Sequence, residues 1–268
     1  MRTVSLVVAG ALSALCFLAF TLALNGYQLT EEGTGRRLLE RALVALTDLD
    51  AALPALQDSL RQAAEEAQGP TVGVPDFPVP VELSREEAQT LEGQALRQRL
   101  LAEGSARMYR QGSGALLSDP EAERRLETTS MPWALEQGLG LITEETHGNL
   151  QVAMIVLGAL SLLLLVPVLW SPPLWGKISL LGAVLLVASL PPLAGALGVR
   201  FFLRAAQGDA DLFVRELLQV GIDAMTVPVR NYLALSALGS GLLVVAAAMV
   251  WAGSRGRAPA LTGKGDAA

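Results

Sequence analysis

The sequence predicts an all-α membrane protein with four transmembrane helices and a helical extracytoplasmic domain inserted between helices 1 and 2. The first observation is four runs of 20 to 22 residues without an ionisable side chain. At about 1.5 Å per residue, each run is long enough to cross about 30 Å of hydrocarbon. The second observation is a long polar stretch between the first two runs. The runs are residues 3–24, 150–170, 178–199 and 232–251.

The composition agrees with a chain that is partly in lipid. Hydrophobic residues make up 51% of the chain and charged residues only 17%, whereas soluble domains carry about 25% charged residues. The charge deficit is confined to the four apolar runs. The single cysteine, Cys16, excludes an intrachain disulfide.

The N-terminal segment, residues 1–24, is either a cleaved signal peptide or an anchor. Its apolar run of 22 residues exceeds the core of about 7–15 residues that is typical of signal peptides. No Ala-x-Ala cleavage site precedes Asn25. We therefore expect an uncleaved anchor that forms the first transmembrane helix.

Residues 25–149 are expected to form one acidic domain outside the cytoplasm. They contain 21 Asp and Glu residues against 11 Arg and no Lys, a net charge of −10. Such a field disfavours nucleic acid and anionic lipid as partners of this domain. The charge is explained either by solubility or by a cationic partner, and solubility is the simpler explanation.

The clearest pattern in this domain is a heptad repeat that predicts one helix over residues 38–67. It serves either as an oligomerisation or partner-binding seam, or as a face packed within the domain's own bundle. Leu38 and Leu43 widen the apolar stripe, which favours the bundle. Pro54 predicts a kink or a restart. The candidate seam residues are Leu39, Leu46, Leu49, Leu53, Leu56 and Leu60.

The repeat is followed by a segment that favours extended backbone and then by further helices. Residues 68–82 contain spaced valines and several prolines, which predict an extended linker without a hydrogen-bond ladder. Ser84 and Glu87 predict a capping box that begins a helix reaching residue 111. Two further helix starts are expected at residues 118–121 and at Pro132.

The membrane half begins with transmembrane helices over 150–170 and 178–199, joined by a short turn at 171–177. Pro191 and Pro192 lie inside the second of these helices and predict a kink, which is either a hinge or a static bend. Small-residue pairs permit close helix approach in the first and fourth transmembrane helices. These pairs are Gly10 with Ala14 and Ala237 with Gly241.

The rest of the chain comprises an outer loop, a fourth transmembrane helix and a tail. The loop, 200–231, contains an amphipathic helix at 209–225 that we expect to lie on the membrane surface. The fourth helix is 232–252, and the tail, 253–268, lacks periodicity and is expected to be disordered. Basic residues beside the first helix, in the 171–177 turn and in the tail place both termini in the cytoplasm.

The residue types needed for catalysis are sparse. His147 is the single histidine, beside Glu144 and Glu145, and a metal site needs three or four ligands at suitable spacing. A solvated histidine at the membrane interface is the simpler interpretation, and a membrane-embedded enzyme would have to use these three residues. No nucleophile elbow or phosphate-binding loop is present. We therefore expect no enzyme, no cofactor and no bound metal.

The predicted function is a scaffold or assembly role in a bacterial-type cell membrane. The transmembrane helices would contact the lipid bilayer. The outer domain would bind another envelope protein or a second copy of the chain. In layout alone, with a large outer domain between helices 1 and 2, the chain resembles the permeases of cell-division and macrolide-export ABC transporters. No sequence motif of that class accompanies the layout. The alternative is a permease-like or mechanotransmission subunit with a separate ATPase.

Overall fold

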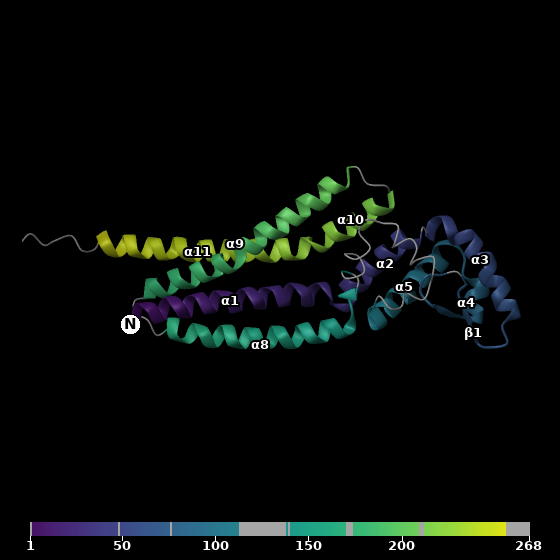
Figure 1. Cartoon of the computed structure of the whole chain (residues 1–268), viewed down its shortest axis with the longest axis horizontal. Coiled ribbons are helices and arrows are strands. Elements are labelled where there is room, and N and C mark those ends of the chain that lie inside the picture. The colour runs from purple at the N-terminus through teal and green to yellow at the C-terminus, as the bar shows by residue number, and fades with distance from the viewer. Residues whose placement is uncertain are drawn as a thin grey trace, which may run out of the picture. The chain divides into compact units, whose positions relative to one another are not determined.

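A computed structural model of the chain is predominantly helical and divides into two compact units (Figure 1). The first unit comprises Met1–Thr21, Ile155–Gly195 and Val229–Ala268, and the second comprises Leu22–Met154 and Ala196–Pro228. The structure describes residues 2–47, 49–75, 77–112, 138, 140–169, 174–208 and 212–255.

Four helices are long and apolar enough to cross a membrane, which indicates a multi-pass membrane protein. Each coincides with one of the four predicted apolar runs and begins before it, because helical hydrogen bonding does not end where hydropathy falls. α8, for example, begins six residues before the predicted boundary at residue 150. The four helices are α1 (Arg2–Leu29), α8 (Glu144–Leu169), α9 (Leu174–Ala206) and α11 (Thr226–Arg255).

The exposed apolar surface is concentrated on these four helices. Among the described residues, all of the exposed large hydrophobic side chains except Leu141 belong to them. Trp175, Phe201, Phe202 and Trp251 are exposed near helix ends, where aromatic side chains favour the membrane–water interface. An apolar surface of this extent is stable only when lipid covers it.

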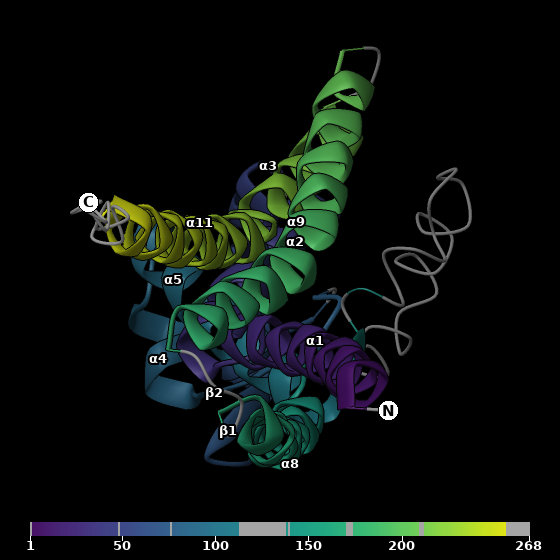
Figure 2. The same ribbon diagram turned by 90° about the vertical axis from the view of Figure 1, so that its left-hand side faces the viewer.

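Within the first unit, α9 and α11 cross each other (Figure 2) and approach closely at small residues. A Cβ atom on Gly182 would lie 2.9 Å from the carbonyl oxygen of Gly239. Further along the same two helices, the hydroxyls of Ser189 and Ser236 are 2.9 Å apart and share a hydrogen bond. Ala237 and Gly241, the small pair that would permit close approach in the fourth helix, are both exposed, and a Cβ on Gly241 would meet nothing within 4 Å.

The second unit has a hydrophobic core built from four helices and a small hairpin, and α10 belongs to the same unit. Leu39, Leu43, Leu60, Leu83 and Leu96 are among its fully buried side chains. Its elements are α2 (Glu32–Thr47), α3 (Leu49–Glu66), β1 (Thr71–Gly73), β2 (Glu82–Ser84), α4 (Arg85–Thr90), α5 (Gly93–Gln111) and α10 (Leu212–Ala224).

The predicted heptad helix over 38–67 is two helices, α2 and α3. α2 ends at Thr47 and α3 begins at Leu49, and α3 continues through Pro54. Pro54 is the sixth residue of α3, beyond its first turn, so it removes one helical hydrogen bond without ending the helix.

The prediction of an all-α fold, with an extended linker at residues 68–82 that has no hydrogen-bond ladder, was wrong. β1 and β2 pair antiparallel, with Val72 opposite Leu83, and Val74 N–H donates to Val81 O at 2.9 Å. Val72, Val74, Val79, Val81 and Leu83 are buried in the core. The prolines lie outside the paired positions, so no ladder donor is lost.

The predicted capping box at Ser84 is confirmed, whereas the length of the helix that follows is wrong. Ser84 accepts from Glu87 N–H at 3.2 Å, and Glu87 Oε2 accepts from Ser84 N–H at 3.0 Å. Hydrogen bonds from Ser84 lower the pKa of the Glu87 carboxyl. The helix breaks at Leu91 and Glu92, and α5 begins at Gly93, whose φ of 50° favours glycine.

Several predictions lie outside the described residues. These are the helix starts at 118–121 and Pro132, residues 171–173 of the predicted turn, residues 209–211 of the loop helix, and the tail beyond residue 255. The rest of the predicted turn, residues 174–177, is the start of α9.

Substitutions at buried and half-buried positions of the heptad pattern distinguish packing within the domain's own bundle from pairing between two chains. Leu60→Ala removes a side chain that is 0% exposed, and we expect it to lower the free energy of unfolding by about 2–5 kcal/mol. Leu53→Ala, at a half-buried heptad position, should cost less than half as much. Urea unfolding of the full chain in detergent, followed by circular dichroism, measures both. Equal losses that depend on protein concentration would instead indicate a seam between chains.

The α9–α11 contact predicts opposite effects for two glycines. Gly182→Ala places a Cβ against backbone that cannot move aside, and we expect a destabilisation of about 1–3 kcal/mol. Gly241→Ala makes the same chemical change in open space and should be neutral or stabilising. The melting temperature in detergent, from the fraction that remains monodisperse after heating, measures both. A Gly182→Ala variant as stable as Gly241→Ala would contradict the close contact.

Candidate docking groove

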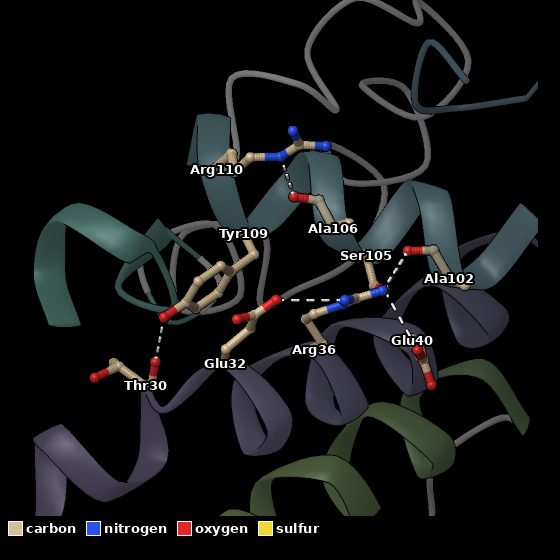
Figure 3. Close-up of polar contacts among 9 residues, drawn as sticks. All are labelled: Thr30, Glu32, Arg36, Glu40, Ala102, Ser105, Ala106, Tyr109 and Arg110. Atoms are coloured by element: carbon tan, nitrogen blue, oxygen red, sulfur yellow. Dashed lines mark hydrogen bonds and ion pairs between the residues drawn. The ribbon is translucent and has the colours of Figure 1, made fainter. Parts of the chain in front are cut away.

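Two helices of the second unit, α2 and α5, are held together by hydrogen bonds from side chains to backbone carbonyls (Figure 3). Arg36 Nη2 donates to Ala102 O at 2.9 Å, and Tyr109 Oη donates to Thr30 O at 2.8 Å. Gly104 of α5 allows the close approach, since a Cβ there would lie 3.1 Å from Leu43 Cδ1. These hydrogen bonds and the close approach at Gly104 fix which faces of α2 and α5 turn toward α10.

The helix α10 packs on α2, although the two are far apart in sequence. Arg41 of α2 forms an ion pair with Asp223 of α10. Gln219 Nε2 donates to Asp223 Oδ1 at 3.0 Å, and Gln207 Nε2 donates to Gln219 Oε1 at 3.2 Å. A polar chain therefore joins α2, α10 and the turn that follows α9.

The apolar side of α10 is buried. Leu217, Leu218 and Ile222 are buried, and Gly221 lies against Leu203, whose Cδ1 would be 3.2 Å from a Cβ. We expected this helix to lie on the membrane surface. In the structure, α10 packs on α2 and forms a wall of the second unit.

A groove of about 540 Å³ lies between α2, α5 and α10. Each helix contributes residues at helical spacing, so one face of each turns toward the groove. Its apolar residues come from all three helices. The groove is lined by Glu40, Arg41, Val44, Arg97, Leu101, Glu216, Gln219, Val220 and Asp223.

The charges of the groove are unevenly compensated. Arg41 is paired with Asp223, and Arg97 Nε donates to Asp50 Oδ1 at 2.6 Å. Glu40 accepts a hydrogen bond from Ser105 at 3.4 Å. Neither Glu40 nor Glu216 forms an ion pair with any residue that the structure describes. The groove therefore combines an apolar strip with two uncompensated carboxylates.

A second hollow, of about 430 Å³, lies between α9 and α11 in the first unit. Trp175 and Trp251 flank it, and Ser179, Ala246 and Ala247 are among its other lining residues. None of its lining residues is ionisable, so it has no group with which to orient a charged ligand. Lipid acyl chains suffice to fill it, and we take the groove of the second unit as the candidate site.

The candidate seam residues lie mostly in the core of the second unit. Leu39, Leu49, Leu56 and Leu60 are buried there, and Leu53 packs against it half-buried. The side chain of Leu46 lies outside those described. This placement favours the bundle interpretation over the seam.

The candidate hinge residues Pro191 and Pro192 lie within α9, which is helical from Leu174 to Ala206. Pro191 is exposed and Pro192 half-buried. Ser189, two residues earlier, is bonded to Ser236 of α11. The helix is therefore anchored to its neighbour directly before the two prolines.

His147 corrects the expectation of a solvated side chain. Its ring stacks on Tyr27 with centroids 4.4 Å apart, and Thr30 Oγ1 lies 3.3 Å from His147 Nδ1. These contacts join α1 and α8 within the second unit. In the described ranges, no group of three or more His, Cys, Asp or Glu residues could hold a metal ion.

Tyr109 has a shifted pKa. Burial raises the pKa of its phenol above the ordinary 10.0, and the nearby carboxylates Glu32, Glu144 and Glu31 raise it further. The neutral phenol is the form that donates to Thr30 O.

No family model, curated protein or solved structure matches the chain.

None of the groove residues was singled out from the sequence as a site. The one available signal was the amphipathic helix around 209–225, whose polar face contains Glu216 and Gln219. Which helix this face meets depends on packing between distant segments.

The Tyr109 phenol predicts an alkaline loss of stability. Because the folded-state pKa is raised, its contribution is complete below about pH 10 and is lost as the pH rises through the folded pKa. Tyr109→Phe should remove this slope and cost about 1 kcal/mol at pH 7. Urea unfolding in detergent between pH 7 and 11 measures both effects. Tyr27→Phe, which also removes one phenol, should keep the slope, and equal slopes in wild type and Tyr109→Phe would contradict the assignment.

Proposed function

We propose that the chain is a non-enzymatic integral membrane protein of a bacterial-type cell membrane, whose outer domain binds or positions another envelope protein. The observation that carries the proposal is the groove between α2, α5 and α10, which lies in the acidic second unit. An open groove with apolar and charged lining suits a protein segment better than a reacting small molecule.

The packing of α10 on α2 supports the proposed topology. With four membrane crossings, residues 25–149 and 200–231 lie on the same side of the bilayer, and these segments contain the two helices. The basic residues flanking the other membrane ends favour a cytoplasmic position for both termini in this proposal. The domain and the loop form one extracytoplasmic body in this proposal.

We assign no catalytic role to the groove or to His147. The imidazole on which a hydrolase of this chain would depend is engaged with Tyr27 and Thr30. Those contacts hold α8 against α1, so the imidazole has a structural role.

A second candidate function is a permease-like or mechanotransmission subunit with a separate ATPase. The observation that favours it is the polar chain from Arg41 through Asp223 and Gln219 to Gln207. Through it, the helix that follows α1 is connected to the loop between α9 and α11.

Cysteine-directed crosslinking in intact cells tests the scaffold role and its topology together. Gln98 is exposed on α5, one turn from Leu101 of the groove. In a Cys16→Ala background, Gln98→Cys should react in whole cells with a membrane-impermeant maleimide that carries a photo-crosslinker. After illumination it should capture an envelope protein with a domain outside the cytoplasm, identified by mass spectrometry.

Gly253→Cys, exposed at the end of α11, is the matched control and should react only after lysis. The reverse labelling pattern would invert the topology. Recovery of a cytoplasmic ATPase with the purified chain, and of no outer protein at Gln98→Cys, would favour the transmission function.

A further inference from the structure

We propose that the groove binds a basic segment of the partner protein, in which a Lys or Arg side chain is next to an apolar one. This inference rests on the proposed function and names the chemistry of the partner. It depends on the composition of the lining and on which of its charges are already paired.

The charge of the groove is negative after its internal pairs are formed. With Asp50, which neutralises Arg97, the region has four carboxylates and two guanidinium groups. Arg41 is neutralised by Asp223. The charges left to face an occupant are those of Glu40 of α2 and Glu216 of α10. A cation in the groove therefore meets two carboxylates, one from each of these helices.

The apolar part of the lining selects against a bare cation. Val44, Leu101 and Val220, one from each helix, form an apolar strip next to the carboxylates. Burying this strip under an apolar side chain gains about 25 cal/mol per Å². An inorganic cation or a polyamine would leave the apolar strip exposed to water. A peptide segment with adjacent basic and apolar side chains satisfies both features.

The surroundings add electrostatic guidance. The stretch 25–149 has a net charge of −10, so a basic segment approaches down a favourable potential. The same field opposes acidic segments and nucleic acid. Binding should therefore weaken as the salt concentration rises.

Peptide binding to the full chain in phosphatidylcholine nanodiscs tests the chemistry. The probe is a fluorescein-labelled Gly-Ser peptide with a central Lys-Leu-Lys, and empty nanodiscs are the blank. Anisotropy should show binding that is lost when the core is Glu-Leu-Glu and weakened when it is Lys-Ser-Lys. Glu40→Gln with Glu216→Gln should raise the Kd by about three- to tenfold, as expected for two exposed ion pairs.

Two further variants locate the site. Glu65→Gln with Glu86→Gln makes the same charge change at exposed positions outside the groove lining and should leave the Kd unchanged. Val220→Arg places a cation in the groove and should block the peptide. An equal loss in both double variants, or undiminished binding by Val220→Arg, would overturn the assignment of the groove.

A photo-reactive residue in place of Val220 separates this inference from the proposed function in native membranes. A crosslink to a basic, apolar segment of an envelope protein supports both. A crosslink to an acidic or uncharged segment overturns the inference and leaves the scaffold role standing. A crosslink to a second copy of this chain makes the groove a self-association site and overturns the inference. If the peptide binds as expected but no envelope protein is captured, the scaffold role fails while the chemistry of the groove stands.

Discussion

The constraint on which the rest of the structure depends is that α1, α8, α9 and α11 present apolar side chains outward over most of their length. Lipid supplies no hydrogen bonds, so each helix satisfies its own backbone. Lipid also supplies no hydrophobic force between helices, so they associate through close packing and polar contacts. The Gly182–Gly239 approach and the Ser189–Ser236 hydrogen bond provide both. The second unit is the opposite case, because its core consists of leucines and valines removed from water.

Local patterns made much of this structure predictable. The four uncharged runs identified the long helices, and Ser84 with Glu87 identified a helix start, since both signals depend on neighbours in sequence. The hairpin was missed although Val72 and Val74, and Val79 and Val81, alternate as strand residues do. The prolines between them outweighed that alternation, and only the register shows that they avoid the paired positions.

The groove could not be predicted for a different reason. Arg41 and Asp223 are 182 residues apart, and in the sequence each is an ordinary charge on a helix face. The contact of His147 with Thr30 spans 117 residues and has no local signal either. The heptad leucines represent an intermediate case. Their spacing predicted burial correctly but did not specify whether the covering surface belonged to the same chain.

The forces that hold α10 bear on whether the groove is preformed. Arg41 and Asp223 are largely exposed, and such pairs contribute about 0–1 kcal/mol. Leu217, Leu218 and Ile222 are buried, and each such side chain contributes about 1.5–3 kcal/mol. The apolar contacts therefore hold the helix in place, and the polar chain sets its register. Breaking the chain would leave α10 attached, whereas moving α10 would expose three apolar side chains to water. This balance favours a groove whose walls are in place before an occupant arrives, as a scaffold needs, over one that opens and closes with each cycle of a motor.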